Sequence, residues 1–355
     1  MILAQNCAYL QIVMTDMRKY WNILAGAALV CLLCAGCKKE EDETREYLDG
    51  TLSMDFPTYV NPGYSKTYEL KSMTTVYRAD GGTLGFYVTD PATGARDTLV
   101  LGDGKVLKDT FTITVPDTLA NLSFTFGAFC EDGVYYGTTV QKSFTVVKPG
   151  LNDNASITGF TQAPTSQTLT DPRDGRVYPI VDIAGIQWMR SNLAWSGVGT
   201  VFSECEAMRD VFGGFYTWEQ AKNACPQGWS LPSDADILQL ASSQGVAADP
   251  LSHINGLAGK LMGNLSFNGS KMWEYWPAVK ITDSAQLSLM PVGYVENFSS
   301  DKLKFTGLNE YAAFWTSDQV DGRGVMRYVY QDKDIVYISA VSKKDIAVPV
   351  RCVKK

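Results

Sequence analysis

Tryptophan is confined to one part of the chain, and its distribution divides the sequence into two regions. Beyond the first 37 residues, all seven tryptophans lie between Trp188 and Trp315. Residues 38–187 contain none, although they are rich in Thr, Val, Phe and Tyr. A chain of 355 residues is long enough for two domains, each with its own hydrophobic core. The change in composition therefore predicts two domains of different kinds.

A polar segment separates these two regions. Residues 149–169 begin with Pro-Gly and contain many Asn, Asp, Thr and Ser residues, which is the composition expected between domains. We therefore predict an N-terminal domain over residues 49–148 and a C-terminal domain over residues 170–355, joined by this linker.

The beginning of the chain has the features of an export signal. A basic pair, Arg18-Lys19, precedes an uncharged apolar run that is too short to span a bilayer. The next segment resembles a bacterial lipobox, although Cys34 stands where that motif usually has leucine. The resemblance implies cleavage before Cys37, whose thiol then carries a lipid anchor. Residues 1–37 thus form the predicted lipoprotein signal peptide and lipidated cysteine, and an ordinary cleaved signal is the alternative.

The residues that follow Cys37 are charged and offer no apolar side chain to bury. Residues 38–48 begin with Lys-Lys-Glu-Glu-Asp-Glu, which predicts a disordered tether. The acidic cluster also resembles the signal that sends lipoproteins of the Bacteroidetes group to the outer face of the outer membrane. We therefore expect a cell-surface protein that contacts the outer membrane through its lipid anchor only, with the periplasmic leaflet as the alternative.

The N-terminal domain shows the alternation of apolar and polar residues that is typical of antiparallel strands. Phe111, Ile113 and Val115, for example, fall on one face of a predicted strand. About seven such strands in about 100 residues predict an all-β sandwich. The end of this region resembles the bacterial Ig-like modules that space surface domains from their anchors. Cys130 is expected on an inward strand face, as a buried free thiol.

The C-terminal domain combines strands with signals for helix starts. Thr217 and Gln220 have the spacing of a capping box, and Ser233 can cap a second helix. Asp174-Gly175 predicts a hairpin turn near the start of the domain. Strands are predicted at 312–317, 325–330, 335–339 and 347–353. The expected order is strands, two helices, an irregular segment over about 246–310 and further strands, which makes an α+β domain.

A set of motifs occurs in order through this domain. They are Thr170 to Tyr178, Trp188 to Leu193, Tyr216 to Ala221, Cys225 to Pro232, Pro291 to Tyr294, Phe314 to Ser317 and Val350 to Val353. Together they resemble the Fibrobacter succinogenes major paralogous domain, a family similar to the C-type lectin-like fold. In that fold a helix cysteine pairs with one in the last strand, which implies a disulfide between Cys225 and Cys352. Cys205 then has no partner in its own domain, and a bond to Cys130 across the linker is the alternative to a free thiol.

Composition excludes several kinds of site. His253 is the only histidine, so a zinc site that needs two or three imidazoles cannot be built. A net charge of −7 gives no broad attraction for nucleic acid. No glycine-rich phosphate-binding motif follows a predicted strand. We therefore expect no metal, no cofactor and no nucleic-acid partner.

Enzymes are the least favoured class. The formylglycine-generating oxidases share the general fold and hold copper with two cysteines, for which Cys205 and Cys225 are the candidates. A bond from Cys225 to Cys352 would remove that pair. Calcium-dependent lectins have an Asn-Asp pair after a strand tryptophan, whereas Thr-Ser follows Trp315. No catalytic residue is therefore predicted.

The aromatic residues Trp273, Tyr275 and Trp276 are the candidate ligand contacts, because aromatic rings stack on sugars or fill pockets on a partner. In an extended segment, Trp273 and Tyr275 face one way and Trp276 the other, so core packing is the alternative for at least one ring. We expect a non-catalytic adhesion protein that binds a glycan or a protein partner through the C-terminal domain. A structural or fimbria-associated subunit of the cell envelope is the alternative function.

Overall fold

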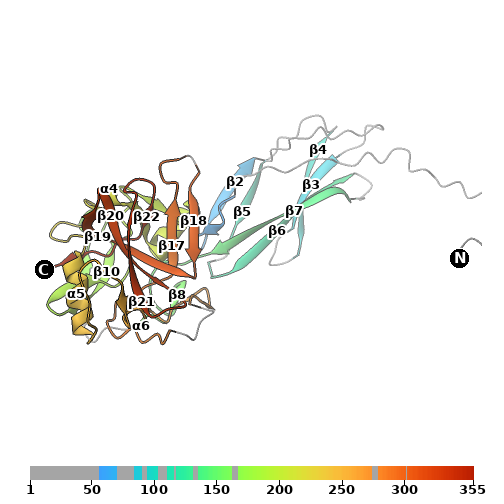
Figure 1. Cartoon of the computed structure of the whole chain (residues 1–355). Helices are drawn as coiled ribbons and strands as arrows, with labels where there is room; N and C mark the ends of the chain where they lie inside the picture. Colours follow the sequence, from blue (N-terminus) through green and yellow to red (C-terminus); the bar gives the residue numbers. More distant parts are fainter. Residues whose placement is uncertain are drawn as a thin grey trace, which may run out of the picture.

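The structure is a computed structural model (Figure 1). It describes residues 56–69, 84–89, 94–102, 110–115, 117–130, 135–161, 167–273, 279–300 and 302–355. The predicted signal peptide with Cys37, the tether, Tyr275 and Trp276 lie outside the described residues. In the part of the chain that is described, no helix is long and apolar enough to cross a membrane.

The N-terminal part consists of a five-stranded and a two-stranded sheet. The larger sheet has the order β1-β7-β6-β3-β4, and β2 pairs with β5. These strands are β1 (Tyr59–Val60), β2 (Ser65–Glu69), β3 (Leu84–Thr89), β4 (Arg96–Gly102), β5 (Thr110–Thr114), β6 (Asn121–Cys130) and β7 (Tyr135–Val146). Ile113 and Val115 are buried, as the alternation predicts. Phe124 and Phe144 meet edge to face across β6 and β7, with ring centroids 5.3 Å apart.

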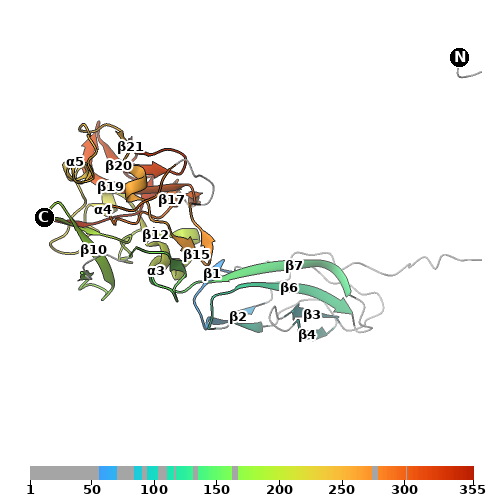
Figure 2. The same ribbon diagram turned by 90° about the horizontal axis from the view of Figure 1, so that it is seen from below.

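Residues 147–161, which we call the junction, fold against the C-terminal part of the chain. Val147 and Ile157 are fully buried there beside Phe212 and Leu265. Strand β8 (Ile157–Thr158) pairs antiparallel with β15 (Ser266–Phe267). Figure 2 shows β6 and β7 running side by side towards α3 and β15. Much of the segment expected to be a linker therefore makes tertiary contacts.

Residues 167–355, which we call the head, contain short strands. The strand orders are β23-β11-β10-β9, β12-β13-β22-β17-β18, β14-β21-β20-β19 and β16-β15-β8. The bounds are β9 (Thr168–Thr170), β10 (Val177–Ile183), β11 (Ile186–Met189), β12 (Thr200–Val201), β13 (Gly214–Thr217), β14 (Ile254–Asn255), β16 (Ser270–Lys271), β17 (Val292–Glu296), β18 (Lys304–Leu308), β19 (Tyr311–Val320), β20 (Arg323–Tyr330), β21 (Ile335–Val341), β22 (Ala347–Val348) and β23 (Val353–Lys354). The hairpin predicted at Asp174-Gly175 is confirmed, because β9 and β10 pair antiparallel on either side of it.

The helices are few and short. They are η1 (Phe202–Glu204), η2 (Glu206–Met208), α3 (Arg209–Phe212), α4 (Trp218–Ala221), α5 (Asp234–Ser243) and α6 (Ala258–Leu261). The capping box of Thr217 and Gln220 is formed, and Ser233 caps α5 together with Asp236. Instead of an even α+β mixture, the described residues are mostly β with few short helices.

The main core of the head lies between α5 and the sheet of β19, β20 and β21. Ile237 and Leu240 of α5 share this core with Phe314 and Val329 of the sheet. At one end, the buried guanidinium of Arg327 donates a hydrogen bond from Nε to Oδ1 of Asp234 over 3.1 Å. The first turn of α5 is thereby fixed to β20 by a buried ion pair.

Candidate binding surfaces

The predicted contact Trp273 is part of the core. Its side chain is 3% exposed, and its indole nitrogen donates a hydrogen bond to the carbonyl oxygen of Leu289 over 3.3 Å. The ring of Trp273 therefore packs in the core, which was the alternative to a ligand contact. The described structure places neither Tyr275 nor Trp276, so their role as ligand contacts remains a prediction.

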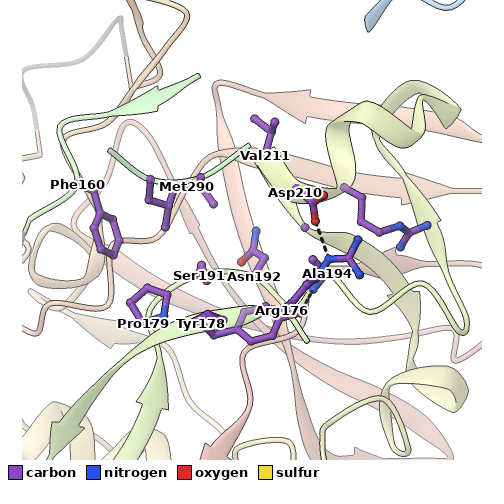
Figure 3. Close-up of a pocket in the computed structure, with 15 residues that line it drawn as sticks. Phe160, Arg176, Tyr178, Pro179, Ser191, Asn192, Ala194, Asp210, Val211 and Met290 are labelled. Atoms are coloured by element: carbon purple, nitrogen blue, oxygen red, sulfur yellow. Dashed lines mark hydrogen bonds and ion pairs between the residues drawn. The ribbon is translucent and has the colours of Figure 1, made fainter. Parts of the chain in front are cut away.

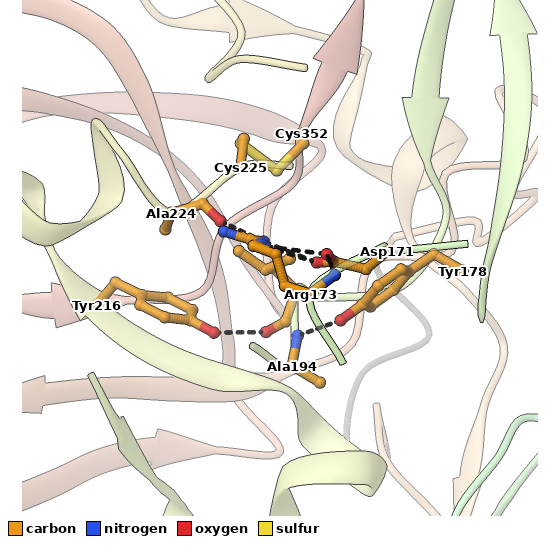
Figure 4. The surroundings of a disulfide bond; sticks show 9 residues. Asp171, Arg173, Tyr178, Ala194, Tyr216, Ala224, Cys225 and Cys352 are labelled. Carbon is orange, nitrogen blue, oxygen red and sulfur yellow. Dashed lines mark hydrogen bonds and ion pairs between the residues drawn. A yellow bond between two sulfur atoms is a disulfide. The ribbon is translucent and has the colours of Figure 1, made fainter. Parts of the chain in front are cut away.

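Cys225 and Cys352 form the disulfide that the family resemblance implied (Figure 4). Cys205 is a buried free cysteine, and its thiol contacts the carbonyl oxygen of Ser203 at 3.3 Å. With Cys225 bonded to Cys352, no thiolate pair of Cys205 and Cys225 exists in this state. Within the described ranges, no three His, Cys, Asp or Glu side chains gather as a metal ion would require.

Four half-buried tyrosines form a line across two sheets of the head. We call Tyr294, Tyr311, Tyr328 and Tyr337 the tyrosine row. The rings of Tyr311 and Tyr328 stack with centroids 4.8 Å apart, and those of Tyr328 and Tyr337 stack with centroids 5.1 Å apart. Tyr294 leans on Tyr311 at 5.1 Å, and His253 meets Tyr337 edge to face at 5.2 Å. A continuous aromatic surface results.

Strand register explains why these rings meet. Tyr328 of β20 lies directly opposite Tyr337 of β21, so both side chains point to the same face of the sheet. The neighbouring residues Val329 and Val336 point to the other face, into the main core. The tyrosine row therefore occupies the opposite face of the sheet, where Tyr294, Tyr311 and Tyr328 pack at the edge of a second core that contains Trp315 and Met326. Stacking covers part of each ring, and the half-buried side chains leave the remainder for a partner.

The hydroxyl groups of Tyr294, Tyr311 and Tyr328 remain protonated at neutral pH. Burial raises the pKa of Tyr294 to about 12 and also raises the pKa values of Tyr311 and Tyr328. At one end, the Tyr294 hydroxyl donates to Glu296 over 2.9 Å, and Glu296 forms an ion pair with Lys304 at 2.7 Å. The row thus combines apolar ring area with hydrogen-bonding groups.

A pocket of about 340 Å³ opens where the junction meets the head (Figure 3). We call it the junction pocket. Figure 3 shows Phe160, Pro179 and Met290 on one side and Asp210 with Arg176 on another. No local sequence pattern predicts this pocket, because its lining residues come from the junction, β10, α3 and the segment before β17.

The polar side of the junction pocket carries an ion-pair network. Nε of Arg176 donates to Oδ1 of Asp210 over 2.6 Å, and Nη1 of Arg176 donates to Oδ2 of Asp174 over 2.7 Å. These two hydrogen-bonded carboxylates raise the pKa of Arg176. Arg209, which also lines the pocket, is paired with Glu206. Both guanidinium groups are therefore neutralised by carboxylates.

The apolar wall of the junction pocket is held in place by Arg190. Its guanidinium carbon lies 4.2 Å from the centroid of the Phe160 ring, within the range of a cation–π contact. Arg190 also donates to the carbonyl oxygens of Gln286 and Thr161. The junction is thus attached to the head on the side where the pocket forms.

These observations define the class of the head. It is a mostly β domain in which short strands are joined by one disulfide and buried arginines, and its described surface carries an aromatic row and one pocket beside the junction. Residues 181–354 match the family model of the Fibrobacter succinogenes major domain, and this C-terminal region is a domain of that family, as its motifs indicated. No curated protein and no solved structure is similar enough to the chain to count as a match.

Proposed function

We propose that this protein is a non-catalytic surface lipoprotein that binds a glycan or a protein partner through its head. The tyrosine row is the observation that carries this proposal. Four half-buried rings gather on one side of the head, and although Tyr294, Tyr311 and Tyr328 pack against its second core, each keeps part of its side chain exposed for a partner.

Tyrosine suits a recognition surface for two physical reasons. Its ring supplies a large contact area at a low cost in side-chain entropy, and its hydroxyl group both donates and accepts hydrogen bonds. Tyrosine is accordingly enriched at protein interfaces and among the residues that dominate binding energy. In the row, stacking between Tyr311, Tyr328 and Tyr337 already fixes the rings, so binding would order few additional rotamers.

The finer description of the fold belongs to the same proposal. The family match and the bond from Cys225 to Cys352 support a C-type lectin-like head. The two N-terminal sheets, which are antiparallel except where β1 pairs with β7, support an Ig-like sandwich. In this arrangement the N-terminal part spaces the head from a lipid anchor at Cys37 on the outer membrane. The disulfide at Cys225 favours binding over an oxidase reaction that requires this residue as a thiolate.

The proposal is tested with the full-length protein purified in detergent. It is screened against a glycan array and immobilised host matrix proteins, and the double variant Tyr328→Ala, Tyr337→Ala is measured beside it. We expect a ligand whose affinity falls at least about tenfold in the variant, as is usual when interface tyrosines of this kind are truncated. The near-ultraviolet circular dichroism of both proteins shows whether the fold is retained.

Two further variants separate the alternatives. Leu119→Ala changes an exposed apolar residue of the N-terminal part, and we expect unchanged binding. Tyr275→Ala, Trp276→Ala tests the contacts predicted from the sequence. Loss of binding in this variant alone would move the site to that segment. Co-purification with a filament in place of ligand capture would favour the structural subunit instead.

A further inference from the structure

We infer that the junction pocket is a second binding site, and that its ligand is a neutral polyhydroxylated molecule such as a terminal sugar residue of a glycan. This site is separate from the tyrosine row and does not depend on the function proposed for it. Its volume of about 340 Å³ lies at the lower end of the range for small-molecule pockets. The pocket therefore suits one sugar ring better than an extended chain.

The charges around the pocket select against an anion. Arg176 is shared by the carboxylates of Asp174 and Asp210, and Arg209 is paired with Glu206. Two guanidinium groups and three carboxylates leave no net positive charge to attract a phosphate, a sulfate or a carboxylate. A neutral ligand does not depend on such an attraction.

The polar groups match neighbouring hydroxyl groups of a sugar. Within the described residues, Oδ2 of Asp210 accepts no hydrogen bond and Nη2 of Arg176 donates none, so the ion pair offers an acceptor and a donor side by side. One hydroxyl of a vicinal diol can donate to the carboxylate while the next accepts from the guanidinium. Molecules that carry only one kind of hydrogen-bonding group would leave half of this pair unused.

Tyr178, which also lines the pocket, offers a second polar contact. The Tyr178 hydroxyl accepts a hydrogen bond from the backbone N–H of Ala194 over 3.1 Å, and among the described residues its own proton has no acceptor. Burial raises the pKa of Tyr178 to about 12, so this donor is retained at neutral pH. The half-buried Ser191 lines the pocket as well.

The apolar wall completes the match. Phe160, Pro179 and Met290 present carbon surface on one side of the pocket (Figure 3). A sugar ring has both C–H faces and hydroxyl groups, and it can therefore satisfy the apolar and the polar sides at once. Because the contact with Arg190 holds the Phe160 ring, this part of the wall is formed before a ligand binds.

The test uses the full-length protein in detergent and the methyl glycosides of glucose, galactose and mannose as probes. Saturation-transfer NMR reports contact, and a titration gives the affinity. We expect at least one neutral glycoside to bind, and the methyl glycoside of glucuronic acid to bind more weakly than its neutral counterpart. Asp210→Asn should lower the affinity about tenfold, because a hydrogen bond to a carboxylate is replaced by a weaker neutral one.

Asp174→Asn is the matched control. Asp174 is bonded to the same guanidinium as Asp210 but does not line the pocket, so its variant should bind with nearly unchanged affinity. If Asp210→Asn loses its fold, Ser191→Ala serves as the second test. This small change in the pocket wall should also lower the affinity. The inference is overturned if no neutral glycoside binds, if the uronic acid binds more tightly, or if Asp210→Asn and Ser191→Ala both bind as the unmodified protein does.

Discussion

Arg351 and Leu287 are joined by a hydrogen bond in the interior of the head, where Nη1 of Arg351 donates to the carbonyl oxygen of Leu287 over 2.8 Å. Both residues are fully buried. Arg351 also donates to the side-chain oxygen of Asn192 over 2.7 Å and to the carbonyl oxygen of Ser288 over 3.2 Å. Arg351 directly precedes Cys352. One short segment near the C-terminus therefore carries both the disulfide and the hydrogen bonds that hold the irregular segment before β17.

Replacing Arg351 should therefore destabilise the head strongly. Arg351→Met keeps much of the side-chain length but leaves buried oxygen atoms of Asn192, Leu287 and Ser288 without their donor. We expect the free energy of unfolding to fall by about 3 kcal/mol or more. Urea unfolding measures this change. A loss below about 1 kcal/mol would show that these acceptors find other partners.

Loss of the disulfide should be at least as costly. The bond between Cys225 and Cys352 closes a loop with a sequence separation of 127 residues. In the chain-entropy model, its removal in Cys225→Ala, Cys352→Ala lowers the free energy of unfolding by about 5 kcal/mol. The control is Cys205→Ala, which removes a buried free thiol and should have a much smaller effect. Urea unfolding of both variants under oxidising conditions gives the comparison.

Alkaline pH should weaken the head through Tyr178. Burial raises its pKa from 10.0 to about 12, so the unfolded chain loses this proton at a lower pH than the folded protein does. The stabilising contribution is complete below pH 10 and is lost as the pH rises to about 12. Unfolding measured across this interval should show a smaller decline in Tyr178→Phe. An identical decline would assign the effect to other groups.

Membrane attachment should depend on one cysteine. Cys37→Ser removes the thiol that the lipobox resemblance assigns to the lipid anchor, and the variant should appear in the soluble fraction without palmitate labelling. Cell fractionation and metabolic labelling test this. Cys34→Ser, three residues earlier, is the control and should remain attached. Unchanged labelling of Cys37→Ser would contradict the lipoprotein prediction.

Local sequence patterns predicted the elements that local interactions determine. The capping boxes begin α4 and α5 at the expected residues, because the cap residue and its partner lie within one turn. Alternation placed Ile113 and Val115 in a core for a similar reason. The bond from Cys225 to Cys352 came from family resemblance, since nothing in the spacing alone selects that pair.

The candidate surfaces depend on relations between distant residues, which no local pattern contains. Tyr328 lies in a predicted strand, but its contact with Tyr311 needs the register of β19 against β20. Trp273 looked like a ligand contact because an aromatic residue in an irregular segment carries no sign of what covers it. The junction pocket joins Phe160 with Asp210, which belong to separate elements of the chain.

The pairing of β8 with β15 determines how mechanical load passes through the molecule. Val147 continues from β7 into the head core, and Lys148 and Ser156 hold the junction in a closed turn through two hydrogen bonds of 2.9 and 3.0 Å. A pull on a ligand held by the head is therefore resisted by these contacts together with those of Tyr59 in β1 to the rings of Phe202 and Phe267. The protein should yield under tension where β8 separates from β15, before the disulfide-closed part of the head is strained.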